Sequence, residues 1–598
     1  MAGFRPYACF QTVTPPCGKW KSPPCVYVFL RTAIYRPYGC RKSDCYSKKG
    51  NFMSTPTKTQ DVCIIGSGPA GLQAAYYFAK KGLSFTILER SDKISAFLRN
   101  FPRHRTFISI NKVHTGLSNP ETRLRHDWNS LLNDEGILFK DWSRKYFPSA
   151  DDFIDYAETF AKPLADHIIC NANVQRIEKS DDGFLITCAD GATHRAANVI
   201  VATGVSQAWD PGIEGFELAA NYTEFDIDPA LYENKRVLIL GKGNSAFETA
   251  DSLVEHAASI HVMSPNPIKF AWQTHFVGNL RAVNNNFLDT YQLKSQNAVI
   301  DAKALEITKD GDVYTVRAAM TAAEGHEIVL TYDHVIACTG FQFDNSIFAP
   351  DIQPALRHFD KFPVMTGEWE SENVKGLFFA GTIMQSCDYK KTMSGFIHGF
   401  RHNVKSLVDL IVARVQGTDY PTVTTPLTAS ALGDSIIHRI STASGIFLQP
   451  GFMADLIMLD GDEAGKTYHD VPVSWAQNAP FTTGRFLQVT LEYGDFGADA
   501  LHVKRQNNVF GKEPDAFIHP VIRLISDGEV VDEMHMADHL DADWRPRDAR
   551  DGDQGTVLQM TFADAGGTVD PADVARRQLD AFLARVGIGQ AQQQAAAE

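Results

Sequence analysis

Six residues near the start of the chain have the types and spacing of a loop that binds a pyrophosphate. They are Gly66, Ser67, Gly68, Pro69, Ala70 and Gly71, directly after the apolar run 62–65. In this pattern the first glycine permits a tight turn and the second lets the pyrophosphate approach the backbone, while the third lets a helix pack closely on the strand. The N-terminus of that helix offers free N–H groups and the positive end of its dipole to the phosphates.

A carboxylate follows at the distance that this chemistry requires. Glu89 stands 23 residues after Gly66, at the expected end of the next strand, and Arg90 follows it. A carboxylate at this point accepts hydrogen bonds from the hydroxyls of a ribose. The sequence therefore predicts a ligand with an unphosphorylated ribose, as in FAD or NAD. We expect residues 66–71, Glu89 and Arg90 to bind FAD.

The pattern returns 175 residues later in the chain. Its residues are Gly241, Gly243, Asn244, Ser245 and Ala246, after the apolar run 237–240. The next strand is expected to end at Ser264, again 23 residues after the first glycine. This repeat at matched spacing predicts a second dinucleotide in the same chain. Serine at this strand end, with Asn266 and Lys269 nearby, favours NADPH and leaves NADH open.

Further segments have the pattern of apolar strands that end in small residues, which abut such cofactors. They are 199–204, 335–341 and 376–382. Residues 393–399 then open a helix that is expected to run to about residue 412, and its N-terminus can steady negative charge on a reduced flavin. The expected cofactor contacts in these parts of the chain are Val174, Ala202, Thr203, Gly204, Gly381, Thr382 and Phe396.

Length and motif order together predict the domain organisation. A chain of 598 residues is too long for one hydrophobic core. The fold class expected is α/β, with two Rossmann-type dinucleotide-binding domains, the NAD(P) domain being inserted in the FAD domain, and a C-terminal mixed α/β region. The expected segments are a dispensable basic, cysteine-rich extension at 1–52, the FAD domain at 53–221 and 336–415, the NAD(P) domain at 222–335, and the C-terminal region at 416–598.

The C-terminal region carries less information. Strands are expected at 486–494 and 519–525, and a mobile Asp-rich loop at 537–555. A last helix should begin with Asp570 as its cap and Pro571 in its first turn, and the tail from Gln590 should be disordered. We expect this region to cover the flavin or to form a homodimer contact.

Composition excludes several functions. The net charge of −14 disfavours nucleic-acid binding, and no apolar run approaches the roughly 18 residues of a membrane span. None of the ten cysteines forms a Cys-x-x-Cys pair, so no zinc knuckle or thioredoxin-type redox pair is expected. His502, His519 and His535 are too scattered in the sequence to predict a metal site. We expect a soluble cytoplasmic protein, since neither a secretory signal nor a KDEL-type ending is seen.

These motifs, in this order, resemble the class B flavin monooxygenase superfamily. A closer resemblance is to the FAD-dependent oxidoreductase domain-containing protein 2 family. The segments that carry it are 102–112, 124–132, 241–250, 284–295 and 394–401, with further matches at 491–494 and 517–522. The chain departs from the monooxygenase pattern at 216–222, where both the glycine and the histidine of the FxGxxxH motif are missing. That departure puts oxygenation chemistry, but not cofactor binding, in question.

The resemblance implies where the reacting part of the flavin lies. Asn111 falls where related monooxygenases place an asparagine beside the flavin, and Asp127, Trp128 and Asn129 have the character of a site lining. The catalytic residues predicted are Asn111, Asp127 and Asn129. Lys112 and Arg105 either bind the phosphates of NADP or lie at the surface without a role in binding. His398 and Arg401 are further candidates for the lining of the site.

Three functions are consistent with the sequence. The first is an NADPH-dependent monooxygenase that uses O2 on a small organic substrate, in which the flavin performs the chemistry and the protein orients it. The second is an NADPH-dependent reductase or oxidase that passes electrons to a protein or quinone. The third is a flavin-bound scaffold that serves as an interaction module.

Overall fold

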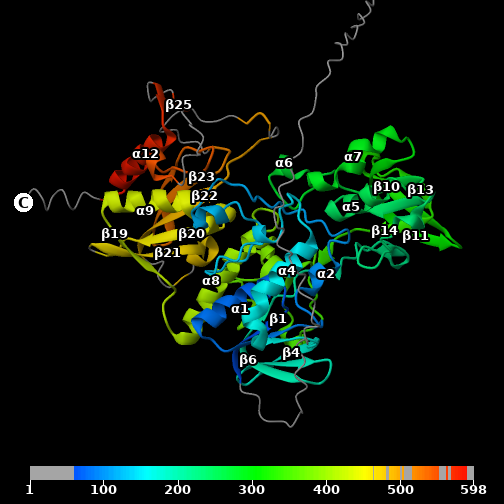
Figure 1. Ribbon diagram of the computed structural model, residues 1–598, viewed down its shortest axis with the longest axis horizontal. Coiled ribbons are helices and arrows are strands. Elements are labelled where there is room, and N and C mark those ends of the chain that lie inside the picture. Colours follow the sequence, from blue (N-terminus) through cyan, green and yellow to red (C-terminus); the bar gives the residue numbers. More distant parts are fainter. Residues whose placement is uncertain are drawn as a thin grey trace, which may run out of the picture. The chain divides into compact units, whose positions relative to one another are not determined.

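The computed structural model describes residues 59–461, 463–477, 479, 484–497, 501–503, 515–550, 560–562 and 567–588 (Figure 1). The expectations about the extension 1–52 and the tail from Gln590 concern residues outside this part of the chain. The described residues form two mixed sheets, each built around parallel strands, and then an antiparallel sheet. This arrangement confirms the α/β fold class.

The first sheet is built around the strand that precedes the first glycine loop. Its strands are β1 (Gln60–Ile65), β2 (Phe85–Leu88), β3 (Ile168–Ile169), β4 (Val174–Ser180), β5 (Gly183–Cys188), β6 (Thr193–Val201) and β18 (Leu377–Phe379), in the order β3-β2-β1-β6-β5-β4 with β18 beside β6. β1 lies parallel to β2 and β6, with Ile64 beside Ile87 and Ile200. Its last four residues are buried, as befits a strand that is covered on both faces.

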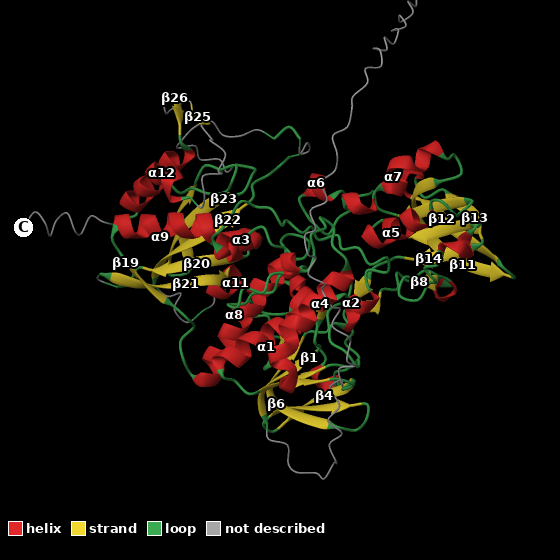
Figure 2. Cartoon of the chain, viewed as in Figure 1, coloured by secondary structure: helices red, strands yellow, loops and turns green. Residues whose placement is uncertain are grey.

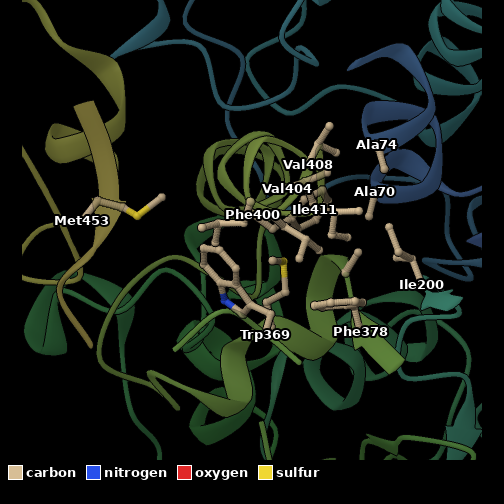
Figure 3. Packing of buried hydrophobic residues seen from close by; sticks show 14 of the residues in the cluster. Ala70, Ala74, Ile200, Trp369, Phe378, Phe400, Val404, Val408, Ile411 and Met453 are labelled. Carbon is tan, nitrogen blue, oxygen red and sulfur yellow. The ribbon is translucent and has the colours of Figure 1, made fainter. Parts of the chain in front are cut away.

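Helices cover this sheet and connect its strands. They are α1 (Pro69–Lys81), α2 (Ala96–Asn100), α3 (Pro120–Leu124), α4 (Ala150–Ala161) and α8 (Ile397–Gln416). Figure 3 shows side chains of α8, including Phe400, Val404 and Val408, gathered beside Ala70 and Ala74 of α1. The spacing of four residues places the α8 side chains on one face of that helix. All five are buried, and the two alanines let the helices pack closely.

The second sheet repeats the same plan. Its strands are β8 (Ala220–Asn221), β9 (Arg236–Leu240), β10 (Ser259–Ser264), β11 (Ala298–Asp310), β12 (Val313–Met320), β13 (Glu327–Tyr332) and β14 (His334–Ala337), in the order β13-β12-β11-β10-β9-β14-β8. The helices that accompany it are α5 (Asn244–Leu253), α6 (Ala271–Thr274) and α7 (Asn286–Thr290). β9, α5 and β10 thus repeat the order of β1, α1 and β2.

The second sheet is slightly longer in sequence than the expected range 222–335. β8 begins at Ala220, and β14 continues to Ala337 in parallel pairing with both β8 and β9. Val335 and Ile336 are buried in this position, because β14 lies between two other strands. The apolar run at 335–341 therefore completes the second sheet before the chain returns to the first.

The chain passes between the two sheets along paired linkers. β7 (Gln207–Ala208) on the outgoing path pairs antiparallel with β15 (Phe341–Gln342) on the return path. Further contacts come from Arg103, whose guanidinium donates to the carbonyl oxygens of Thr223 and Phe225 at 3.3 and 2.7 Å. Because β18 then rejoins β6, the second sheet is an insertion within the first domain, as expected.

The C-terminal region contains a six-stranded antiparallel sheet. Its strands are β19 (Val423–Pro426), β21 (Ala464–Pro472), β20 (Met453–Met458), β22 (Arg485–Glu492), β23 (His519–Ser526) and β24 (Glu529–His535), in that spatial order. Figure 2 shows α9 (Ala429–Thr442) and α12 (Pro571–Arg585) side by side, and α9 contacts β22. Smaller elements are α10 (Ser444–Leu448), α11 (Val473–Ala476), β16 (Leu356–Arg357), β17 (Phe362–Pro363), β25 (Met560–Phe562) and β26 (Gly567–Val569). The carboxylate of Asp570 accepts from the N–H of Ala572, which confirms the expected cap of α12.

The prediction of a mobile Asp-rich loop is wrong for its described part, 537–550. Trp544 in this segment is fully buried, and its indole N–H donates to the carbonyl oxygen of Ala537 at 2.9 Å. The buried guanidinium of Arg125 donates to the carbonyl oxygen of Ala542 at 2.9 Å. Composition suggested solvation, but one aromatic side chain and one distant arginine anchor the segment.

Among the described helices, none is both long and apolar enough to cross a membrane.

Candidate functional site

A candidate site is a cavity of about 620 Å³ at the carboxyl end of β1. That volume lies within the range of about 300–1,000 Å³ that is usual for ligand sites. The predicted residues that line it are Gly66, Gly68, Pro69, Ala70, Glu89, Arg90, Asn129, Val174, Ala202, Thr203, Gly204, Gly381, Thr382 and Phe396. Residues from several distant parts of the sequence are therefore brought to one cavity.

The glycine loop has the geometry of a phosphate cradle. Gly66 has φ +104°, and a Cβ at this position would lie 2.8 Å from the carbonyl oxygen of Ala202. A Cβ on Gly71 would collide with the carbonyl oxygen of Gly66, so Gly71 is needed for α1 to pack on β1. By contrast, a Cβ on Gly68 would meet no protein atom within 4 Å. The protein itself leaves this space open, directly before the free N–H groups of α1.

Glu89 is held in one orientation at the wall of the cavity. Its side chain is buried, and Oε2 accepts from the backbone N–H of Ser67 at 3.0 Å and from the Ser67 hydroxyl at 2.6 Å. Oε1 accepts from the N–H of Ser91 at 3.0 Å. Ser67 therefore does not line the cavity but fixes the carboxylate, whose remaining lone pairs can accept hydrogen bonds from a ribose.

Four buried polar atoms of the cavity wall test whether the site fits a polar cofactor. They are Ser95 Oγ, Ser109 Oγ, Asn129 Oδ1 and Thr203 Oγ1, and none has a hydrogen-bond partner among the described residues. A buried polar atom without a partner costs about 1–3 kcal/mol. A ligand rich in hydroxyl and carbonyl groups would satisfy these atoms, so the residues present fit FAD.

The second glycine loop has the same geometry on the second sheet. Gly241 has φ +124°, and a Cβ there would collide with the carbonyl oxygen of Cys338, just as Gly66 faces Ala202. Gly243, like Gly68, leaves space in which a Cβ would meet no protein atom within 4 Å. α5 begins at the next residue, Asn244, so its free N–H groups border this space.

The remaining residues of the second loop have separate tasks. Ala246, at the position of Gly71, is fully buried, and the carbonyl oxygen of Ser245 accepts from the hydroxyl of Thr249 at 2.8 Å. The side-chain amide of Asn244 donates to the carbonyl oxygens of Gly278 and Asn279 at 3.1 and 3.0 Å. These bonds tie the start of α5 to the loop at 276–281.

The end of β10 has an acidic neighbour that the sequence did not reveal. Ser264 pairs in register with Asp301 on β11, and the ammonium of Lys242 contacts the Asp301 carboxylate. The same ammonium donates to the carbonyl oxygen of Ser264 at 3.2 Å. Ser264 itself carries no charge, yet a carboxylate and a lysine both lie beside it. Sequence spacing could not predict this pair, because Asp301 is 37 residues away on a neighbouring strand.

The loop tied to the second cradle reaches the wall of the first cavity. The ring of Phe276 lies edge-on to that of Phe396, with 5.8 Å between centroids. Phe396 lines the cavity and stacks on His398, which in turn stacks on Trp128 with ring centroids 4.8 Å apart. Through Phe276 and Phe396, the second cradle is therefore connected to the wall of the first cavity.

Two of the three predicted catalytic residues lie outside this cavity. Asp127 caps a turn, since its carboxylate accepts from the N–H groups of Asn129 and Ser130 at 2.9 and 2.8 Å. Asn111 donates from its amide to the carbonyl oxygen of Ser143 at 2.7 Å and lines a second cavity. Only Asn129 faces the first cavity, where its Oδ1 is free to accept.

The other candidates from the sequence lie in three different surroundings. Arg401 is fully buried and donates to the carbonyl oxygens of Ser130 and Leu124, both at 2.7 Å, so it holds the loop that carries Asn129. Arg105 pairs with Asp151 near the surface. Lys112 lies over the Trp128 ring. Sequence reasoning missed Ser95 and Ser109, because no motif marks the loops that carry them.

The histidines of the C-terminal region are closer together than their spacing suggested. His519 Nε2 and His535 Nδ1 lie 3.0 Å apart, because β23 and β24 are paired. No group of three or more potential metal ligands occurs within the described ranges.

Residues 63–381 match the family described as pyridine nucleotide-disulphide oxidoreductase. The chain is 34% identical over 504 residues to FAD-dependent oxidoreductase domain-containing protein 2 of Mus musculus, which covers 77% of this chain and 76% of the relative. The protein of the same name from Danio rerio is 34% identical over 522 residues, covering 78% and 76%. Among solved structures, a bacillithiol disulfide reductase of Staphylococcus aureus is 21% identical, with a TM-score of 0.47, and covers 60% of this chain and 99% of its own.

Replacing Gly68 with valine should remove FAD without unfolding the protein. The added side chain meets no protein atom but occupies the space of the pyrophosphate. We expect FAD affinity to fall at least tenfold, or about 1.4 kcal/mol. Flavin content of the purified variant, with circular dichroism as a control for folding, measures this. Full flavin content in a folded Gly68→Val protein would contradict the assignment of the first cradle.

Gly243→Val is the matched variant in the second cradle. It should retain FAD but be reduced by NADPH at least tenfold more slowly, while dithionite still reduces its flavin fully. Rapid-mixing absorbance under anaerobic conditions measures the rate. Loss of FAD from this variant, or an unchanged rate of reduction, would show that the second loop does not hold the coenzyme.

The pair Lys242–Asp301 should set the choice of coenzyme. Asp301→Asn removes a carboxylate beside Ser264 and frees Lys242, so NADPH should gain about 1 kcal/mol relative to NADH, roughly fivefold in kcat/KM. Ser264→Asp should shift the ratio in the opposite direction. The measurement is the ratio of kcat/KM for the two coenzymes, and shifts of the same sign in both variants would contradict the placement of the ribose.

Proposed function

Because this chain belongs to the FAD-dependent oxidoreductase domain-containing protein 2 family of pyridine nucleotide-disulphide oxidoreductases, we propose that it is an NADPH-dependent monooxygenase acting on a small organic substrate with O2. Family membership makes the chain a flavoprotein oxidoreductase that binds FAD. The choice of monooxygenation and of NADPH is our proposal.

The observation that carries the proposal is the contact at Phe396, which connects the second cradle to the wall of the first cavity. Asn244 holds the loop 276–281, and Phe276 of that loop contacts Phe396 at the cavity wall. FAD, when bound, supplies hydride acceptance from the coenzyme and electron transfer to the next acceptor. The chain's own residues orient the two dinucleotides toward one another, which converts an encounter in solution into a reaction between held partners.

The cysteines among the described residues argue against disulfide reduction as the function. None of the five lines the first cavity. Burial raises the pKa of the Cys188 thiol to about 11, and it raises the pKa values of Cys338 and Cys387 to about 12. Burial also raises the pKa of Cys63 well above its ordinary value. These four thiols stay protonated at neutral pH and are poor nucleophiles.

The wall of the cavity suits a reaction that must exclude water. Phe107 and Phe400 are buried and line it together with Ile397. Next to these apolar groups, Asn129 presents its Oδ1 as an acceptor. Its amide nitrogen donates to the carbonyl oxygen of Ile110 at 3.3 Å, which fixes the direction of the side chain. We propose that Asn129 holds a proton-bearing atom of the reacting groups beside the apolar side chains of this wall.

One observation favours a second candidate, an oxidase or reductase that passes electrons to a quinone or protein. At 216–222, where flavin monooxygenases carry FxGxxxH, this chain places Tyr222, and the Tyr222 hydroxyl donates to the Glu248 carboxylate at 2.7 Å. Burial raises the pKa of Glu248 above its ordinary value. The histidine of the monooxygenase motif has no counterpart at this position.

Oxygen-18 labelling distinguishes the two candidates. The FAD-loaded enzyme is supplied with NADPH and oxygen-18 gas, and a panel of small nucleophilic or aromatic compounds is screened. A monooxygenase incorporates one labelled oxygen atom into a product for each NADPH oxidised by the coupled reaction. If every compound leaves all of the electrons in hydrogen peroxide or in an added quinone, the monooxygenase proposal is wrong and the second candidate stands.

A variant pair ties this test to the site. Asn129→Ala should retain FAD but lower the fraction of NADPH that yields labelled product, with a matching rise in peroxide. Asn133→Ala is the control, because Asn133 belongs to the same loop, bonds to the carbonyl oxygens of Leu131 and Ile137, and does not line the cavity. Equal coupling in the two variants would contradict the role of Asn129.

A further inference from the structure

A second cavity, of about 460 Å³, lies beside the loop that carries Asn111. The residues that line it are Asn111, Lys112, Val113, His114, Thr115, His126, Arg144 and Tyr146. No acidic residue is among them, whereas Lys112 and Arg144 are cationic and two others are histidines. A basic, hydrogen-bonding wall of this composition is complementary to an anion.

Neither cation of this cavity lies in an ion pair within the described part of the chain. Neither Lys112 nor Arg144 forms an ion pair with any residue that the structure describes, although the net charge of the chain is −14. The Lys112 ammonium lies 3.7 Å from the centre of the Trp128 ring, and the Arg281 guanidinium lies 5.8 Å from the same ring. The aromatic face accommodates the two cations but does not neutralise them.

The surroundings of Lys112 disfavour its charged form. Burial and then the neighbouring Arg281 lower the pKa of Lys112 to about 7, against the opposing effect of Asp127. Burial and then Lys112 and Arg125 lower the pKa of His126 to about 4. An anion bound beside Lys112 raises the pKa of this lysine, so binding near pH 7 to 8 takes up a proton there.

The second cavity adjoins the first through a short stretch of chain. Ser109 lines the first cavity, and Asn111, two residues later, lines the second. Between them the carbonyl oxygen of Ile110 accepts from Asn129 at the wall of the first cavity. Trp128 contacts Lys112 and stacks on His398, which in turn stacks on Phe396 at the wall of the first cavity. A molecule held by its anionic end in the second cavity is therefore close to the flavin site.

We propose that the second cavity binds the anionic group, a carboxylate or a phosphate, of the substrate that is oxidised at the first cavity. The anion site stands on the cavity and its unpaired cations, whereas its assignment to the substrate rests on the proposed function. The coenzyme also carries phosphates, and Arg281 connects the two regions, since its backbone N–H donates to Asn244 of the second cradle at 3.0 Å. The substrate and the coenzyme are thus two sources of the same chemistry.

Calorimetry with sulfate on the FAD-loaded full-length enzyme tests the site without turnover. We expect millimolar binding at pH 7.5, with proton uptake revealed by buffers of different ionisation enthalpy. K112M and R144M should each weaken sulfate binding at least tenfold. K145M is the control, because Lys145 is exposed and adjacent to Arg144 but does not line the cavity, and it should change the affinity less than twofold. FAD content of each variant reports correct folding.

Any other outcome contradicts either the anion site itself or its assignment to the substrate. Unchanged sulfate affinity in R144M, or in K112M that retains FAD, overturns the site, as does an equal loss in K145M. In a second experiment, sulfate binding is measured in the presence of saturating NADP⁺, which should leave the sulfate affinity unchanged. If NADP⁺ abolishes sulfate binding in the wild type, the cavity serves a coenzyme phosphate and the substrate assignment is wrong. Because no step of this test depends on oxygen or product, its failure is distinct from failure of the monooxygenase proposal.

Discussion

A dinucleotide can bind only where the backbone approaches its pyrophosphate closely and offers unpaired N–H groups, and this constraint shapes both halves of the chain. Gly66 and Gly241 have φ values that residues with a side chain rarely adopt. Each lies against the carbonyl oxygen of the residue that directly follows a neighbouring strand of its own sheet, Ala202 after β6 and Cys338 after β14. Gly68 and Gly243 leave open the space in front of α1 and α5. The strands and helices around each loop hold this arrangement in place.

The rest of the architecture follows from bringing two such loops together. The second sheet is inserted between β6 and β18, and its linkers pair through β7 and β15. The buried carboxylate of Glu248 on α5 accepts from the Tyr222 hydroxyl at 2.7 Å and from the N–H of His104 at 2.9 Å. The N–H of Arg103 donates to the same Tyr222 hydroxyl at 3.1 Å. These contacts anchor the start of the second domain to the loop at 102–112, which also separates the two cavities.

Local motifs were predictable, and contacts across the fold were not. The spacing of Gly66 and Glu89 required a strand, a turn, a helix and a strand, and the structure has β1, α1 and β2 in these places. Asp301 escaped prediction because only strand register brings it beside Ser264. Asp127 has the residue type of a site lining, yet it caps the turn at Asn129, a role that depends on local backbone geometry. Composition gave no sign that Trp544 would anchor an Asp-rich segment.

The central claim is that the two glycine loops hold NADPH and FAD so that a hydride passes from the nicotinamide to the flavin. Anaerobic reduction of the FAD-loaded enzyme by NADPH that carries deuterium on either face of its reactive carbon tests this most directly. The account predicts loss of the flavin's visible absorbance, slowed by deuterium on one face only, because a fixed geometry presents one face to the flavin. Flavin that dithionite reduces but that neither NADPH nor NADH reduces would contradict it.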